Sequence, residues 1–155
     1  MKENFTSTEF TEIATPKLSF LPEKGFTRKH SLEYNSSTVC NLVYAGSHVA
    51  FVVSLDIRDQ CIDDMVVKVC DGALCDEFVQ GGYSSSLYEY LVQHKGYRGS
   101  PSGYYKATDN PRATKLEHRL NGFVSLLLNV GTCLLEDKLD VFMGLDPDEP
   151  ILGRS

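Results

Sequence analysis

Four aspartates lie close together between two apolar runs and are the strongest chemical lead in the sequence. The stretch HVAFVVSLDIRDQCIDDMVVKV contains Asp56, Asp59, Asp63 and Asp64. A calcium loop needs oxygen ligands at close alternate positions, a glycine at the sharp turn and a late glutamate. These aspartates are spaced three, four and one residues apart with no glycine between them. The spacing therefore predicts the polar end of a β-hairpin, which could double as an acidic docking patch, and we expect no metal.

Five cysteines, at positions 40, 61, 70, 75 and 133, are the second source of possible chemistry. An odd count without a secretory signal predicts reduced thiols in a cytosol, with Cys40, Cys61 and Cys70 acting as small apolar residues in strands. The pair in CDGALC lacks the second pair that a zinc site needs, and the four histidines are scattered. A nucleophile at Cys133 or Cys75 would need a histidine brought near by folding.

Familiar catalytic motifs are absent from the sequence. There is no G-x-G-x-x-G, phosphate-binding G-x-x-x-x-G-K-[ST], G-x-S-x-G or H-E-x-x-H. We therefore expect a protein without enzymatic activity or cofactor. The loop YRGSPSGYYK, residues 97–106, combines tyrosines with basic residues, as single-strand nucleic-acid sites do. The acidic character of the whole chain favours a surface loop that its tyrosines anchor to the body.

Charge is distributed unevenly along a chain whose net charge is −6. Residues 56–77 hold seven acids against two bases, a net of −5, and residues 136–149 hold six acids against one base, also −5. Between them, residues 95–119 carry six bases against two acids, a net of +4. Such asymmetry steers charged partners, and an acidic surface fits a basic macromolecule better than nucleic acid.

The elements that must position these residues begin with a helical segment and continue as strands. Pro16 after Thr15 predicts a broken or kinked N-terminal helix, with Thr15 as N-cap of a fresh helix, and Pro22 and Gly25 predict its end. Four runs then have the alternation or the β-branched and aromatic content of strands: residues 30–34, 38–44, 48–57 and 64–70. Their short polar connectors predict an antiparallel meander.

After Gly81 and Gly82 the apolar period becomes helical. Ser86 and Glu89 form a capping box that opens a helix ending near Gly96, and Asn110 with Pro111 predicts the start of a second. From there one apolar stripe contains Leu116, Leu120, Phe123, Val124, Leu127, Leu128, Leu134 and Leu135. We therefore predict an α+β fold: an N-terminal helical segment, a meander of about four strands, and C-terminal helices on one face of the sheet.

Length and composition predict one domain over residues 1–155. Residues 1–80 supply the helix and meander, and residues 83–145 supply the helical part. The longest mostly apolar run, residues 122–135, is shorter than the roughly 20 residues that a membrane span needs. We therefore expect a soluble protein without membrane contact and with a poorly ordered C-terminal tail.

The order of these features resembles bacterial immunity proteins of contact-dependent inhibition and other polymorphic toxin systems. FLPEKGF, residues 20–26, precedes a strand meander that ends in Asp56-Ile57-Arg58, as in many of those antidotes. The resemblance covers about the first 70 residues. It implies a cytoplasmic, non-enzymatic protein that binds one cognate toxin domain as a monomer or weak dimer. The charge argument adds that the toxin is a basic nuclease-type domain.

The resemblance carries over no contact residues, so the candidate docking surface is argued from charge and aromatic content. The acidic candidates are Asp59, Asp63, Asp64, Asp71, Asp76 and Glu77, and the aromatic candidates are Tyr97, Tyr104 and Tyr105. Two alternatives stay open: a small enzyme with a cysteine nucleophile, and an adaptor that self-associates through residues 116–135.

Overall fold

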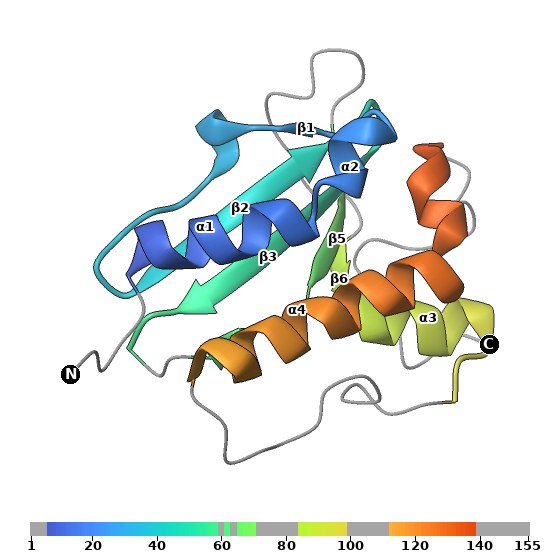
Figure 1. Cartoon of the computed structure of the whole chain (residues 1–155). Helices are drawn as coiled ribbons and strands as arrows, with labels where there is room; N and C mark the ends of the chain where they lie inside the picture. The colour runs from blue at the N-terminus through green and yellow to red at the C-terminus, as the bar shows by residue number, and fades with distance from the viewer. Residues whose placement is uncertain (1–5, 59–60, 63–64, 71–83, 99–111, 139–155) are drawn as a thin grey trace.

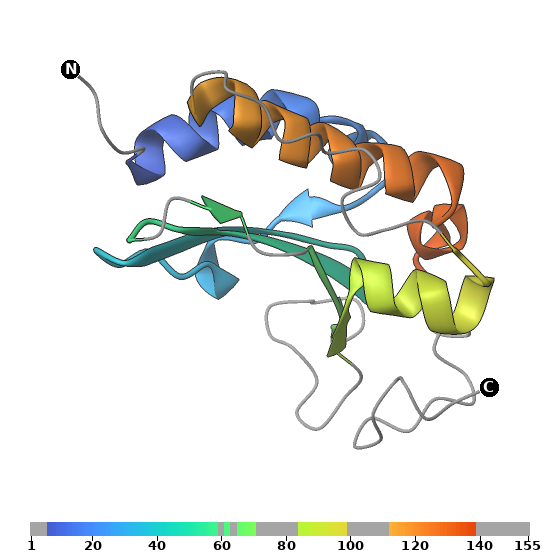
Figure 2. The same ribbon diagram turned by 90° about the horizontal axis from the view of Figure 1, so that it is seen from below.

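The computed structural model describes residues 6–58, 61–62, 65–70, 84–98 and 112–138, and the side chains of 61, 94, 95, 112–116 and 118 are not described. Helices α1 and α4 lie side by side over one face of an antiparallel sheet, and α3 follows β6 at the edge of that sheet (Figures 1 and 2). The helices are α1 (Ser7–Lys17), α2 (Phe20–Glu23), α3 (Leu87–Lys95) and α4 (Arg112–Asn129), with 3-10 turns η1 (His30–Leu32) and η2 (Thr132–Glu136). The predicted α+β architecture is confirmed.

The sheet is built on one long hairpin. Its strands are β1 (Thr27–Arg28), β2 (Val39–Ala45), β3 (Val49–Asp56), β4 (Cys61–Ile62), β5 (Val66–Val69) and β6 (Ser84–Ser86). Among the described residues the order is β1-β2-β3-β5-β6, with β4 paired to the far end of β3, and every pairing is antiparallel. The strands predicted over residues 38–44, 48–57 and 64–70 are confirmed as β2, β3 and β5.

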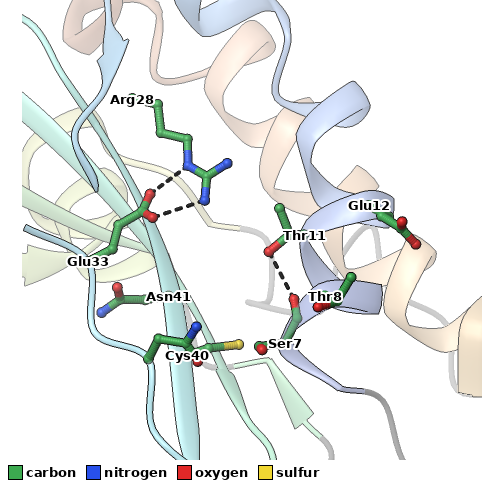
Figure 3. Close-up of a pocket in the computed structure, with 9 residues that line it drawn as sticks. Ser7, Thr8, Thr11, Glu12, Arg28, Glu33, Cys40 and Asn41 are labelled. Carbon is green, nitrogen blue, oxygen red and sulfur yellow. Dashed lines mark hydrogen bonds and ion pairs between the residues drawn. The ribbon is translucent and has the colours of Figure 1, made fainter. Parts of the chain in front are cut away.

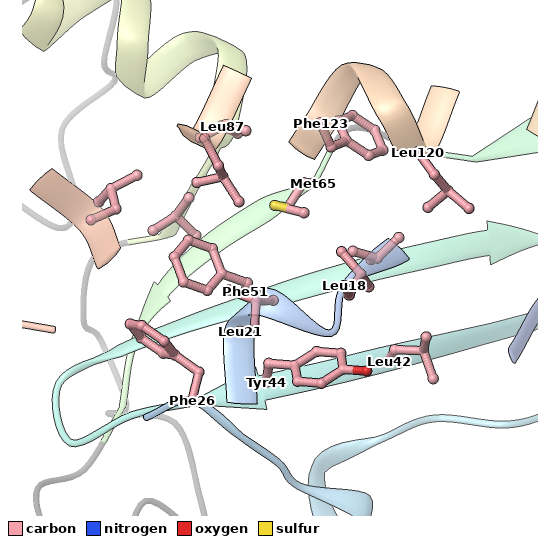
Figure 4. Packing of buried hydrophobic residues seen from close by; sticks show 14 of the residues in the cluster. Leu18, Leu21, Phe26, Leu42, Tyr44, Phe51, Met65, Leu87, Leu120 and Phe123 are labelled. Atoms are coloured by element: carbon pink, nitrogen blue, oxygen red, sulfur yellow. The ribbon is translucent and has the colours of Figure 1, made fainter. Parts of the chain in front are cut away.

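The register of the hairpin explains why one sheet face is apolar. Tyr44 pairs with Phe51, Leu42 with Val53 and Cys40 with Leu55, so alternate residues of both strands point to the same side. These side chains are buried under the helices together with Leu18, Leu21, Leu120 and Phe123 (Figure 4). Phe26 meets Phe51 edge to face, with 5.2 Å between ring centroids. Aromatic and branched side chains at alternate positions thus supply the surface that the helices cover.

The N-terminal helix begins and ends at other residues than the sequence predicts. Thr6 is its N-cap: its Oγ1 accepts from the Glu9 N–H, and the Glu9 carboxylate accepts from the Thr6 N–H. Pro16 lies inside α1, and the break comes at Leu18, so the predicted N-cap at Thr15 is wrong. Proline is tolerated here because it removes a single hydrogen bond in the last turn, after which the helix ends anyway.

The strand predicted over residues 30–34 is wrong. The chain forms the short turn η1 there, and the strand that pairs with β2 is β1, a few residues earlier. The Glu33 carboxylate accepts a hydrogen bond from the Val43 backbone N–H. In a regular ladder, the carbonyl of a paired strand would accept that hydrogen bond. The segment after η1 then runs beside β2 and makes isolated hydrogen bonds to it. In one of these the Asn41 N–H donates to the Tyr34 carbonyl at 3.0 Å. Side-chain chemistry has replaced a regular ladder at this edge.

The C-terminal stripe is split between two elements. α4 ends at Asn129 because the N–H groups of Val130 and Gly131 both donate to the Leu126 carbonyl, each at 2.9 Å. Leu134 and Leu135 are buried from the separate turn η2, whereas Leu128 is 43% exposed. The prediction of one continuous helical stripe is therefore wrong for Leu128, Leu134 and Leu135. Leu126, which the predicted stripe omits, is buried.

The start of α3 matches its prediction. The Ser86 hydroxyl accepts from the Glu89 N–H at 3.1 Å, and Gly96 ends the helix in the left-handed conformation with φ 68°. Asn110 and Pro111, the predicted start of α4, lie outside the described residues. No described helix combines the length and the apolar content needed to cross a bilayer.

Candidate functional site

A polar pocket of about 230 Å³ lies between α1, the segment after β1, and the start of β2 (Figure 3). Its lining comes from three stretches that are distant in sequence: Ser7, Thr8, Thr11, Glu12, Arg28, Glu33, Asn35, Cys40 and Asn41. α1 presents its hydroxyls because its opposite face is buried through Phe10 and Ala14. The pocket is therefore a seam between the helical layer and the edge of the sheet.

An arginine–carboxylate pair, Arg28 and Glu33, lies in the lining. Arg28 donates from Nε to Glu33 Oε2 at 2.8 Å and from Nη2 to Glu33 Oε1 at 2.9 Å, a bidentate geometry. The side chain of Glu33 is 10% exposed and that of Arg28 is 26% exposed. The hydrogen bond to Glu33 raises the pKa of Arg28, against the opposing effect of burial. Arg28 therefore stays charged, and the pair orders both side chains.

Cys40 and Tyr44 are two further titratable groups near this pair. Burial raises the pKa of the Cys40 thiol, and the negative charge of Glu33 raises it further. Burial also raises the pKa of Tyr44, while the nearby Arg28 charge lowers it. Both groups are therefore held in their neutral forms, and Cys40 is a poor nucleophile because the thiolate is the reactive species.

The chemistry that this arrangement can perform is recognition by hydrogen bonding. The lining offers hydroxyls, amides, the Arg28–Glu33 ion pair, the Glu12 carboxylate and the Cys40 thiol, and its volume suits a single side chain or a small polar molecule. Among the described side chains, no group of three or more histidines, cysteines or acids could hold a metal ion. The pocket therefore presents hydrogen-bond donors and acceptors to a polar group.

An exposed tyrosine, Tyr34, lies in the chain between Glu33 and Asn35, two residues that line the pocket. Tyr34 is 61% exposed, yet its N–H donates to Asn41 Oδ1 at 2.7 Å and its carbonyl accepts from the Asn41 N–H at 3.0 Å. Asn41 also lines the pocket, so a pocket residue fixes the backbone of Tyr34. An aromatic side chain on a fixed backbone offers contact area at low entropic cost.

Tyr97 is the one predicted candidate that the structure describes. It is half-buried against the core, its ring meets Tyr88 edge to face at 6.1 Å, and its N–H donates to the Leu91 carbonyl. This tyrosine anchors the end of α3 to the body, whereas residues 99–106 of the predicted surface loop lie outside the described residues. The remaining candidates lie outside the described residues: Asp59, Asp63, Asp64, Asp71, Asp76, Glu77, Tyr104 and Tyr105.

Sequence reasoning missed Arg28, Glu33 and Tyr34. Their roles depend on the reversal of the chain at η1, and no local motif marks that turn. The interpretation of residues 30–34 as a strand hid it, because alternate residues of a strand would have placed Glu33 on a sheet face. The available signal was that Arg28 and Glu33 carry opposite charges on either side of a short polar stretch. Such pairs are common on protein surfaces, so they do not mark a site.

The prediction of reduced thiols is wrong for Cys70, which is disulfide-bonded, whereas Cys40 and Cys133 are free. Cys70 is buried, and its sulfur lies 3.2 Å from the Gly46 carbonyl oxygen. A disulfide sulfur carries no hydrogen, so this is a close contact and not a donated bond. Sequence counting fails here because disulfide formation depends on which sulfurs the fold brings within bonding distance.

Comparisons with protein-family models, with curated proteins and with solved structures find no match to this chain.

Proposed function

We propose that this chain is a non-enzymatic immunity-type protein that binds and neutralises a cognate bacterial toxin domain. The observation that carries the proposal is the exposed, backbone-anchored Tyr34 beside the polar pocket. Tyrosine and arginine are enriched among the residues that dominate binding energy, and an aromatic anchor beside a pocket is a common form of such a site. We name Tyr34 and the nine pocket-lining residues the Tyr34 face.

The charge distribution supports a basic partner. Two segments with a net charge of −5 each, residues 56–77 and 136–149, give the chain an acidic field. Toxin domains that cleave nucleic acid need a basic surface, and opposite charge speeds the encounter of two proteins. The candidate acidic residues Asp59, Asp63 and Asp64 belong to the first of these segments. We still predict that they contact the toxin domain.

The proposal predicts that a toxin domain is encoded directly upstream of this chain, and the direct test uses that domain. Co-expression should restore growth of cells that carry the toxin domain, and the two proteins should co-purify in a 1:1 ratio. Tyr34→Ala should weaken binding at least tenfold while Tyr34→Phe retains it, because the ring supplies the contact. Leu128→Ala, at the other large exposed apolar residue among those described, is the matched control. Failure to bind or to restore growth contradicts the function, whereas unchanged binding by Tyr34→Ala contradicts only the Tyr34 face.

A cysteine-nucleophile enzyme has less support. The Cys133 sulfur lies 3.9 Å from the Tyr90 hydroxyl, and the raised pKa of Cys40 disfavours its thiolate. Cys75, the other predicted nucleophile, lies outside the described residues. A nucleophilic cysteine needs a neighbouring base or positive charge. A self-associating adaptor is also less well supported, because Leu120, Phe123 and Leu127 of α4 are buried within this chain.

The proposed site of action is the cytoplasm, as the immunity-type resemblance implies. The oxidised Cys70 makes this proposal testable, because lasting disulfides are rare in reducing cytosols. Rapid thiol trapping in intact cells, followed by mass spectrometry of the Cys70 peptide, reads its redox state. Reduced Cys70 supports the cytoplasm, and a fully oxidised population indicates an oxidising compartment.

A further inference from the structure

The turn between β2 and β3 directs three successive backbone N–H groups at one carboxylate. His48 and Val49 donate to Asp137 Oδ1 at 2.8 and 3.0 Å, and Ser47 donates to Asp137 Oδ2 at 2.5 Å. Hydrogen bonds to an ionised acceptor are roughly twice as strong as those between neutral groups. Successive N–H groups that converge in this way form an anion-binding concavity.

The surrounding backbone is shaped for this contact. A Cβ at Gly46 would overlap the Asp137 carboxylate, so the absence of a side chain there makes room for it. Asp137 itself has φ 56° and ψ 47°, a left-handed conformation that non-glycine residues seldom adopt. Two backbone requirements, separated by about 90 residues, thus serve one interaction.

The contact also holds a segment of the core in place. Asp137 directly follows η2, whose Leu134 and Leu135 are buried in the main cluster. The Asp137 N–H donates to the Leu134 carbonyl at 3.4 Å, which ties the residue to that turn. The carboxylate therefore fastens the end of the helical layer to the hairpin of the sheet.

We infer that the turn at residues 46–49 is a carboxylate-binding site that Asp137 occupies from within the chain, as a latch for residues 132–138. The receptor consists of backbone N–H groups, so removal of the Asp137 side chain leaves the site intact and open to another carboxylate. The inference concerns the β2–β3 turn and does not depend on the proposed function. Its chemical class of ligand is a small monocarboxylate or an acidic side chain.

Chemical rescue tests the inference. Asp137→Gly removes the carboxylate while permitting the left-handed backbone, and it should lower the thermal midpoint by about 5 °C. Sodium acetate should restore the midpoint of this variant in a saturable manner and shift the Ser47, His48 and Val49 amide resonances. Sodium chloride at equal ionic strength should do neither. Glu136→Gln is the matched control, because Glu136 is exposed and pairs only loosely with Lys138, at 3.5 Å.

Each outcome decides the inference. Equal effects of acetate and chloride on Asp137→Gly, or equal acetate shifts in the wild-type protein, would overturn it. If Asp137→Gly does not fold, Asp137→Asn provides a second test, because asparagine keeps the shape of the aspartate side chain and removes its charge. Intermediate stability with shifted Ser47, His48 and Val49 amides supports the latch, and a wild-type midpoint with unshifted amides refutes it.

Discussion

Glu33 concentrates several interactions on one nearly buried carboxylate. It accepts two hydrogen bonds from Arg28 and one from the Val43 backbone N–H, and its Oε1 lies 3.6 Å from His30 Nδ1. The residue thereby joins the segment after β1 to the middle of β2. Its position shows how one side chain can replace part of a strand ladder.

Glu33→Ala should lower the free energy of unfolding by about 2–3 kcal/mol, because it leaves the Arg28 charge and the Val43 N–H without their partner. Urea unfolding monitored by circular dichroism measures the change. His30→Ala is the control, since His30 is 75% exposed at its side chain and should change stability by less than about 0.5 kcal/mol. Equal losses in the two variants would contradict the role assigned to Glu33.

Cys40 predicts an alkaline dependence of stability. Because burial raises the pKa of its thiol in the folded state, the folded protein holds this proton more tightly than the unfolded chain does. The resulting stabilisation is complete below the ordinary thiol value of 9.0 and is lost as the pH rises through the folded value. Cys40→Ala should therefore flatten the decline of unfolding free energy above about pH 9.

Urea unfolding at a series of pH values measures that slope. Leu42→Ala is the matched control, because it truncates a neighbouring buried side chain of β2 without removing a titratable group. It should lower stability at every pH and leave the slope unchanged. A wild-type slope in Cys40→Ala would show that the thiol makes no such contribution.

At the scale of elements, the first residue of a helix follows from local capping chemistry more closely than its last residue does. The capping residues Thr6 and Ser86 both accept the N–H of the glutamate three residues later. The last residues of α1 and α4, in contrast, differ from those that the sequence pattern predicts. Pro16 did not stop α1, and the apolar stripe did not prolong α4 beyond Asn129.

Thr6→Ala should reduce the unfolding free energy by about 1 kcal/mol, because the first turn of α1 loses its side-chain acceptor. Thr8→Ala is the control, since Thr8 is an exposed residue of the same helix and does not cap it. Chemical denaturation compares the two variants. A smaller loss for Thr6→Ala than for Thr8→Ala would contradict the capping assignment.

At the scale of the molecule, the acidic net charge should govern association kinetics. With a net charge of −6 and a basic partner, the association rate constant should fall by about tenfold or more between roughly 20 and 500 mM salt, while the dissociation rate changes less. Stopped-flow mixing with the toxin domain measures both rates. An association rate independent of salt would show that charge does not steer the encounter.

Much of the fold could be predicted because its signals are local. The β-branched runs marked β2, β3 and β5, and Ser86 with Gly96 marked α3. Residues 30–34 alternate like a strand, yet Glu33 bonds to Arg28 and to the Val43 backbone instead of joining a ladder. The Tyr34 face could not be predicted, because its anchor Asn41 lies on a different segment.

The sequence by itself determined the α+β class, the central hairpin and the helical cover, since apolar period and capping residues act between near neighbours. Only the tertiary structure decided that Asp137 binds the turn after β2, that Arg28 pairs with Glu33, and that Cys70 is oxidised. The first of these contacts joins groups 89 residues apart, and the second depends on the chain reversal at η1. No local pattern of residues encodes such distances.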